Sequence, residues 1–177
     1  MRDFGASSRW ESSQHQEADG AVESKQRIAL GAPVVDFSLA GAHLLGRAYW
    51  SEVEHATWRL VRTRQRSDSL ELRLLGSGPV LLRFGPPTAE ATEDFVRCSY
   101  PIEGGLLARR PAGEIVFAQT GGSRPTVSST IRGFFPRLAS RSNEPSWTGA
   151  LYNGVQSRIH VAVSRRYFKR LVAEARP

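Results

Sequence analysis

Histidine and acidic side chains are the residues of this sequence that could hold a metal ion. The four histidines are His15, His43, His55 and His160, and none has a second histidine one helical turn away, as a zinc-protease motif requires. Glu52 and His55 lie three residues apart, the spacing by which di-iron bundles point two ligands the same way. Such a bundle needs that pair twice and two further glutamates. We therefore expect neither a metal site nor a cofactor.

Nucleophile and phosphate-binding motifs are also missing from the sequence. No Gly-x-Ser-x-Gly elbow and no Gly-Lys-Ser/Thr string occurs, and the segment Gly76-Ser77-Gly78 lacks the third glycine of a dinucleotide fingerprint. We interpret that segment as a turn. The lone Cys98 excludes an intramolecular disulfide and is expected to be a small core residue. Whether the protein catalyses a reaction stays open at this stage.

Positive charge is concentrated in the later part of the chain. The net charge is +7, with five basic against eight acidic residues over 1–54 and nineteen against nine over 55–177. A basic domain favours anionic partners such as nucleic acid, acidic lipid headgroups or phosphorylated metabolites. An arginine-favouring codon usage would give the same composition without any function. The densest basic group is Arg158, Arg165, Arg166, Lys169 and Arg170.

The first sixty residues show weak periodicity. Residues 1–25 are polar and have no period of 2 or 3.6, so we predict a disordered tail. A short strand fits 26–30, the type of 34–45 is ambiguous, and apolar spacings of three and four predict a helix over 47–58. We expect one α+β domain over 26–177. No apolar run approaches the roughly 20 residues of a membrane span, and we expect a cytoplasmic protein.

Beyond Trp58 the apolar period changes to two, which is typical of strands. Short connections with glycine or proline favour an antiparallel meander, because parallel crossovers need longer connections. The expected strands include 70–74, 80–84, 96–102, 106–109, 114–120 and 126–135.

The clearest element is a C-terminal helix that we expect to follow a cap at Ser146 and to reach about residue 173. Apolar residues recur there every four positions, which predicts a long stripe that must pack on something large. The stripe begins with Trp147, Leu151, Val155, Ile159 and Val163.

This order of elements resembles the helix-grip layout of the START-like, or SRPBCC, superfamily, which includes polyketide cyclases and birch-pollen-allergen-like carriers. The resemblance covers 26–175 and rests on element order alone. It implies a curved antiparallel sheet of about six to seven strands, wrapped around the C-terminal helix with a ligand cavity between them. A calycin-like β-barrel is the alternative fold, since it too combines a meander with a late helix.

Two functions of different classes follow. The first is binding of a small apolar or amphipathic ligand in that cavity, with a cyclase-like enzyme as a variant. Its expected lining residues are Tyr100, Phe117, Gln119, Trp147, Tyr152 and His160. Ordinary core packing would explain the same residues. The second function is binding of polyanions, either nucleic acid or acidic lipid headgroups, through the basic group defined above.

Overall fold

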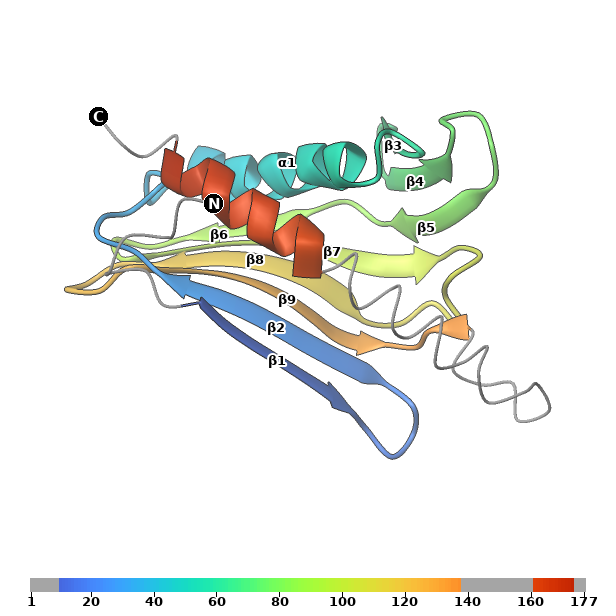
Figure 1. Cartoon of the computed structure of the whole chain (residues 1–177), viewed down its shortest axis with the longest axis horizontal. Coiled ribbons are helices and arrows are strands. Elements are labelled where there is room, and N and C mark those ends of the chain that lie inside the picture. The colour runs from blue at the N-terminus through green and yellow to red at the C-terminus, as the bar shows by residue number, and fades with distance from the viewer. Residues whose placement is uncertain (1–9, 138–160, 174–177) are drawn as a thin grey trace.

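The computed structural model describes residues 10–137 and 161–173 of the chain, and the statements below concern those residues. They form one helix with defined bounds, nine strands and a helical segment at 161–173 (Figure 1). The elements are β1 Trp10–Gln16, β2 Val22–Ala29, α1 Leu39–Ala56, β3 Val61–Gln65, β4 Leu70–Leu74, β5 Val80–Phe84, β6 Thr88–Ala91, β7 Phe95–Gly104, β8 Glu114–Thr120 and β9 Thr126–Phe134.

The strands form one antiparallel sheet in the order β1-β2-β9-β8-β7-β5-β4-β3, with β6 paired to β7. Among the described strands β1 and β3 are the two edges and do not pair, so the sheet stays open. The predicted α+β fold, an antiparallel sheet packed against a C-terminal helix, is thereby confirmed, and the alternative of a closed calycin-like barrel is wrong. The sheet has nine strands rather than six to seven, because β1, β3 and β6 lie where no strand was predicted, while residues 106–109 form none.

The strands β1 and β2 correct the prediction of a disordered tail over 1–25, which is wrong from residue 10 onward. Trp10 to Gln16 pairs with Val22 to Ile28, and β2 then pairs with β9 at the far end of the chain. The outer strand is almost fully exposed on both faces, so it has little of the alternating apolar pattern that marks a strand. Pairing with a distant strand supplied the order that local composition did not indicate.

Two further boundaries differ from the predictions. The helix starts at Leu39 instead of 47, because Ser38 caps it with its hydroxyl oxygen, which accepts a hydrogen bond from the Gly41 N–H at 3.1 Å. Residues 106–109 form no strand, and only an isolated bridge joins Ala108 to Pro136. The strands predicted at 70–74, 80–84 and 114–120 have the predicted bounds.

Both helical elements cover the same face of the sheet (Figure 1). The buried side chains of residues 161–173 join α1 and the inner sheet face in one apolar core, through Val163, Tyr167, Phe168 and Leu171. The predicted helical stretch from 147 to 160 lies outside the described residues. No helix within the described ranges is long and apolar enough to cross a membrane.

Candidate functional site

An aromatic cluster fills the space between the sheet and the two helical elements. Tyr49 of α1 packs on Phe117 of β8 with 4.6 Å between ring centroids, and Tyr167 approaches the same ring at 5.9 Å. Such tilted and edge-to-face pairs contribute beyond their buried area. Trp50, Phe84, Tyr100 and Phe168 extend the cluster, which ends in the contact of Phe168 with Trp10 of β1.

A glycine on α1 makes room for one of these rings. An ideal Cβ on Gly46 would lie 2.5 Å from the Tyr100 hydroxyl oxygen, closer than real Cβ contacts come. The helix therefore approaches β7 closely enough to bury the phenol, of which only 5% is exposed. Any side chain at position 46 would displace either the helix or the phenol.

A buried chain of hydrogen bonds lies beside the aromatic cluster, between β2 and the C-terminal segment. The Ser164 hydroxyl donates to the side-chain oxygen of Gln26 at 3.3 Å, and the Gln26 amide donates to Ser24 at 3.0 Å. Tyr49 shares a further hydrogen bond with Ser164. Buried polar side chains need such partners, so this chain fixes residues 161–173 against α1 and β2.

Three buried polar atoms nearby have no hydrogen-bond partner among the described residues: Ser129 Oγ, Tyr167 Oη and Trp50 Nε1. Ser129 is the cross-strand neighbour of both Gln26 and Phe117, and the Tyr167 ring also contacts Phe117. The indole N–H of Trp50 lies near the Tyr100 hydroxyl without hydrogen-bond geometry. Each buried hydroxyl without a partner costs about 1–3 kcal/mol.

Burial raises the pKa of the phenol groups of Tyr49, Tyr100 and Tyr167, and also the pKa of the Cys98 thiol. The low-dielectric surroundings disfavour the charged form of each group. At neutral pH these groups are therefore protonated and can donate hydrogen bonds. Proton abstraction by one of them would need a pH far above neutral.

The structure separates the residues predicted to line a cavity. Tyr100 and Phe117 lie together in the aromatic cluster, whereas Gln119 does not belong to it: its side-chain oxygen accepts from the Val34 N–H at 2.7 Å and its amide donates to the Val35 carbonyl at 2.7 Å. Gln119 thus holds the segment before α1. The other predicted lining residues, Trp147, Tyr152 and His160, lie outside the described residues.

Sequence reasoning missed several members of this site. Tyr49 and Trp50 were assigned to a helical face without a role, and Tyr167 was left out of the C-terminal stripe. The signal for Tyr167 was available, because it continues the four-residue series that includes Val163. The sequence around Ser129 gives no indication of a role, because a serine that faces the interior can be recognised as unpartnered only once its neighbours in the fold are known.

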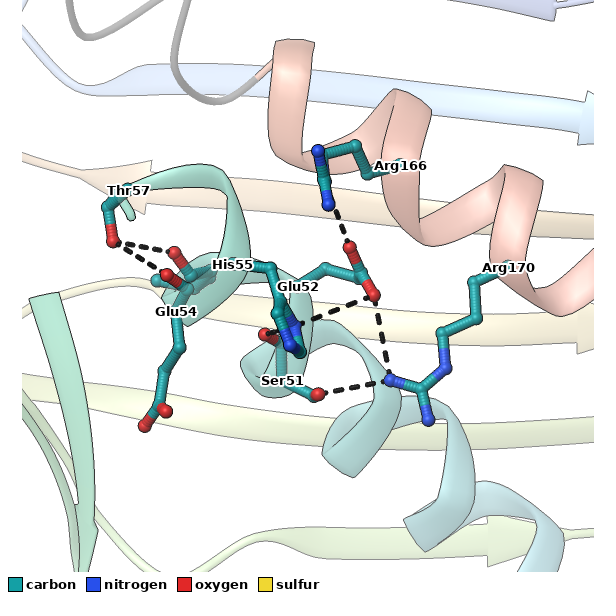
Figure 2. A network of polar contacts seen from close by, with 8 residues as sticks. Ser51, Glu52, Glu54, His55, Thr57, Arg166 and Arg170 are labelled. Carbon is teal, nitrogen blue, oxygen red and sulfur yellow. Dashed lines mark hydrogen bonds and ion pairs between the residues drawn. The ribbon is translucent and has the colours of Figure 1, made fainter. Parts of the chain in front are cut away.

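A second polar network joins α1 to residues 161–173 at the edge of the interior (Figure 2). The carboxylate of Glu52, which is 7% exposed, pairs with Arg166 at 3.2 Å and with Arg170 at 3.5 Å. The Glu52–His55 pair considered above as a metal ligand set is a 3.9 Å contact, and His55 Nδ1 lies 2.8 Å from the Ser51 carbonyl oxygen. The described residues contain no cluster able to hold a metal ion.

This network bears on the predicted polyanion-binding group. Arg166 and Arg170 direct their guanidinium groups at Glu52, so part of their charge is compensated inside the molecule. Arg165 and Lys169 are exposed on the same helical segment, and Arg158 lies outside the described residues. Anion binding by this group stays a prediction.

An open groove of about 550 Å³ lies between the first half of α1 and the segment before it. Its walls include Val34, Phe37 and Leu44, with Arg47 as the basic residue. The Arg47 guanidinium also acts electrostatically on Cys98 and Tyr100, so the groove neighbours the aromatic interior.

Comparisons with known proteins give only a distant structural likeness. No family model matches the chain, and no curated protein is significantly similar in sequence. Two solved structures show a distant likeness at 9% sequence identity. Ara h 8.0201 aligns over 85% of this chain and 99% of its own with a TM-score of 0.39, and human STARD10 over 94% and 72% with a TM-score of 0.41. The helix-grip assignment accordingly rests on the chain's own open sheet and its two covering helical elements.

Proposed function

We propose that the protein binds a small, largely apolar ligand carrying at least one hydrogen-bonding group, enclosed between the sheet and the C-terminal segment. Ligand sites are generally lined by aromatic and aliphatic side chains with a few polar groups that orient the ligand. The surroundings of Phe117 have that composition: the rings of Tyr49 and Tyr167 contact it, Ser129 is its cross-strand neighbour, and Ser164 is hydrogen-bonded to Tyr49.

The observation that carries the proposal is a pair of buried oxygens, Ser129 Oγ and Tyr167 Oη, that lack a hydrogen-bond partner within residues 10–137 and 161–173 and belong to two neighbours of Phe117. A core that serves only packing would be more stable with alanine and phenylalanine at these positions, since a buried unpaired hydroxyl is costly. A ligand oxygen or nitrogen in reach of both would offset that cost.

The described residues support ligand binding without catalysis. The phenol and thiol groups of the interior are held protonated, as their raised pKa values require. They can orient a ligand by donating hydrogen bonds. A cyclase-like reaction would need a proton acceptor from another part of the chain, and His160 and Tyr152 are the residues proposed for that role in such a variant.

The first test is native mass spectrometry of the gently purified protein, followed by denaturation and extraction. We expect a discrete small molecule that leaves on unfolding. Ser129→Ala should lose this added mass. In urea, the free energy of unfolding of its ligand-free form should exceed that of the ligand-free wild type by up to about 1 kcal/mol.

Ser128→Ala is the matched control, because Ser128 adjoins Ser129 on β9 and points to the opposite sheet face. It should change neither bound mass nor stability. Wild-type protein without any added mass, together with a Ser129→Ala variant no more stable than Ser128→Ala, would contradict the proposal.

A further inference from the structure

Four large apolar side chains are exposed together at one end of the sheet. Trp58 and Leu60 follow α1, and Leu74 and Leu75 begin the turn between β4 and β5; their exposed fractions are 88%, 51%, 39% and 64%. The Leu75 N–H donates to the Leu60 carbonyl at 2.7 Å, which joins the two segments. We call these four residues the apolar tip. Figure 1 shows the end of α1, β3 and the β4–β5 turn meeting at this end of the molecule.

The backbone of the tip holds its side chains outward at an energetic cost. Trp58, Arg59 and Leu75 have φ of 48°, 63° and 53°, and they are the only non-glycine residues with positive φ in the described part of the chain. Bulky residues rarely adopt this conformation. The Arg59 N–H donates to the Glu54 carbonyl at 2.7 Å and so keeps the bend in place. Strained positions of this kind cluster at sites of function.

Arginines cover the outer face of the three strands behind the tip. Glu71 of β4 is 1% exposed and pairs with Arg66 at 3.4 Å, Arg73 at 2.7 Å and Arg83 at 3.1 Å. Arg62 and Arg64 of β3 lie on the same face, directly opposite Arg73 and Glu71. We call the five arginines the arginine face; among the described residues Glu71 is the carboxylate paired with three of them, so the face keeps a net positive charge.

The arginine face and the apolar tip are one continuous surface. Arg73 donates from Nη1 to the Gly78 carbonyl in the turn at 3.0 Å, and the Arg62 side chain lies against Gly76 of the same turn. Arg62 and Arg64 form no ion pair within the described ranges. The charge of Arg62 acts at longer range on the Glu54 carboxylate of α1, whereas Arg64 faces the Glu71 position of β4. Arg62 and Arg73 are like charges directly opposite each other, which disfavours the strand pairing. Glu71 already compensates Arg73, so an anion at this face would relieve the remaining repulsion by binding Arg62.

We propose that this surface docks on an anionic lipid bilayer. The tip would enter the interfacial region, where tryptophan side chains are favoured, and the arginine face would lie against the headgroup phosphates. Apolar insertion plus a basic patch is the combination that gives reversible binding to a charged membrane. A second copy of the chain fits this surface poorly, because two arginine faces would repel each other beside the paired tips.

The test is co-sedimentation with vesicles of phosphatidylcholine, with and without phosphatidylserine. We expect binding only when phosphatidylserine is present, and a steep loss of binding as salt is raised. Trp58→Asn and Leu75→Asn remove the apolar groups while asparagine still accepts positive φ, so both variants should fold and bind at least about tenfold more weakly. Arg62→Gln and Arg64→Gln should each cost about fivefold.

Leu44→Gln is the control, since Leu44 is an exposed leucine of α1 away from the tip, and its vesicle binding should equal that of the wild type. Circular dichroism checks that each variant is folded. Unchanged vesicle binding by folded Trp58→Asn would overturn the proposal. So would binding to phosphatidylcholine alone that salt does not weaken, or a wild-type dimer in light scattering that Trp58→Asn dissociates. The proposal would also be overturned if the protein bound single-stranded DNA but no vesicles, and if this binding needed the arginines but not Trp58. The partner of the surface would then be a nucleic acid.

Discussion

The interior around Phe117 and the β3–β5 end of the sheet use aromatic and charged residues in opposite ways. In the interior, Phe117 and Tyr167 are fully buried and hold the sheet to both helical elements. At the β3–β5 end, Trp58 is 88% exposed, and no aromatic ring in the described part of the chain packs against it. Burial makes an aromatic ring a stabilising group, so the large exposed ring contributes little to folding. The comparison teaches that residue type alone does not separate a packing role from a surface role.

The largest expected difference between the two regions is in stability. Phe117→Ala should lower the free energy of unfolding by about 3–5 kcal/mol, because it leaves a cavity among the rings. Trp58→Asn should change it by no more than about 0.5 kcal/mol, as surface substitutions do. Urea unfolding of both variants measures the contrast. Similar losses of unfolding free energy in the two variants would mean that Trp58 is packed in solution, and would contradict the contrast between the two regions.

Acid should weaken the β3–β5 end through Glu71. The hydrogen bond from Arg73 holds the pKa of Glu71 below its usual 4.5. When a carboxyl group has a lower pKa in the folded than in the unfolded protein, its ionised form stabilises the fold. This stabilisation is complete above the pKa of the unfolded state and is lost as the pH falls through the pKa of the folded state. We therefore expect the free energy of unfolding to decrease as the pH falls below about 4.5, the usual pKa of this carboxyl group.

Glu71→Gln should remove that part of the acid dependence and destabilise the protein at neutral pH. Urea midpoints across the acid range measure both effects. Glu90→Gln serves as the control, because the Glu90 side chain is 63% exposed and its ion pair with Arg97 is long, at 4.0 Å. Equal acid profiles for the wild type and Glu71→Gln would show that the arginine face does not depend on this carboxylate.

The smallest expected effect concerns the contact between the two helical elements. Glu52→Gln weakens the pairs with Arg166 and Arg170, whose guanidinium groups are partly exposed, so the loss should be about 1 kcal/mol. Hydrogen exchange should quicken in residues 161–173 and stay unchanged in β3–β5. Uniform acceleration across the chain would contradict a local role for Glu52.

Much of the architecture was predictable because its signals are local. The alternation around Leu70 and Leu72, and the glycine and proline turns, identified β4, β5 and β8 with their bounds. The strand β1 was not predictable, since its order comes from pairing with β2 and, through β2, with β9. For the candidate site, Tyr100 and Phe117 were named in advance, whereas Tyr49, Tyr167 and Ser129 were not.

The amino-acid sequence by itself determined the fold class, the antiparallel sheet and the absence of common catalytic motifs, because periodicity, turn residues and motif spacing are properties of neighbours along the chain. Tertiary structure decided which side chains became partners. Gln119 holds the segment before α1, Glu52 takes two arginines from the C-terminal segment, and Trp58 stays outside while Trp50 is buried. Burial and pairing depend on residues far apart in the sequence, and only the folded chain brings those residues together.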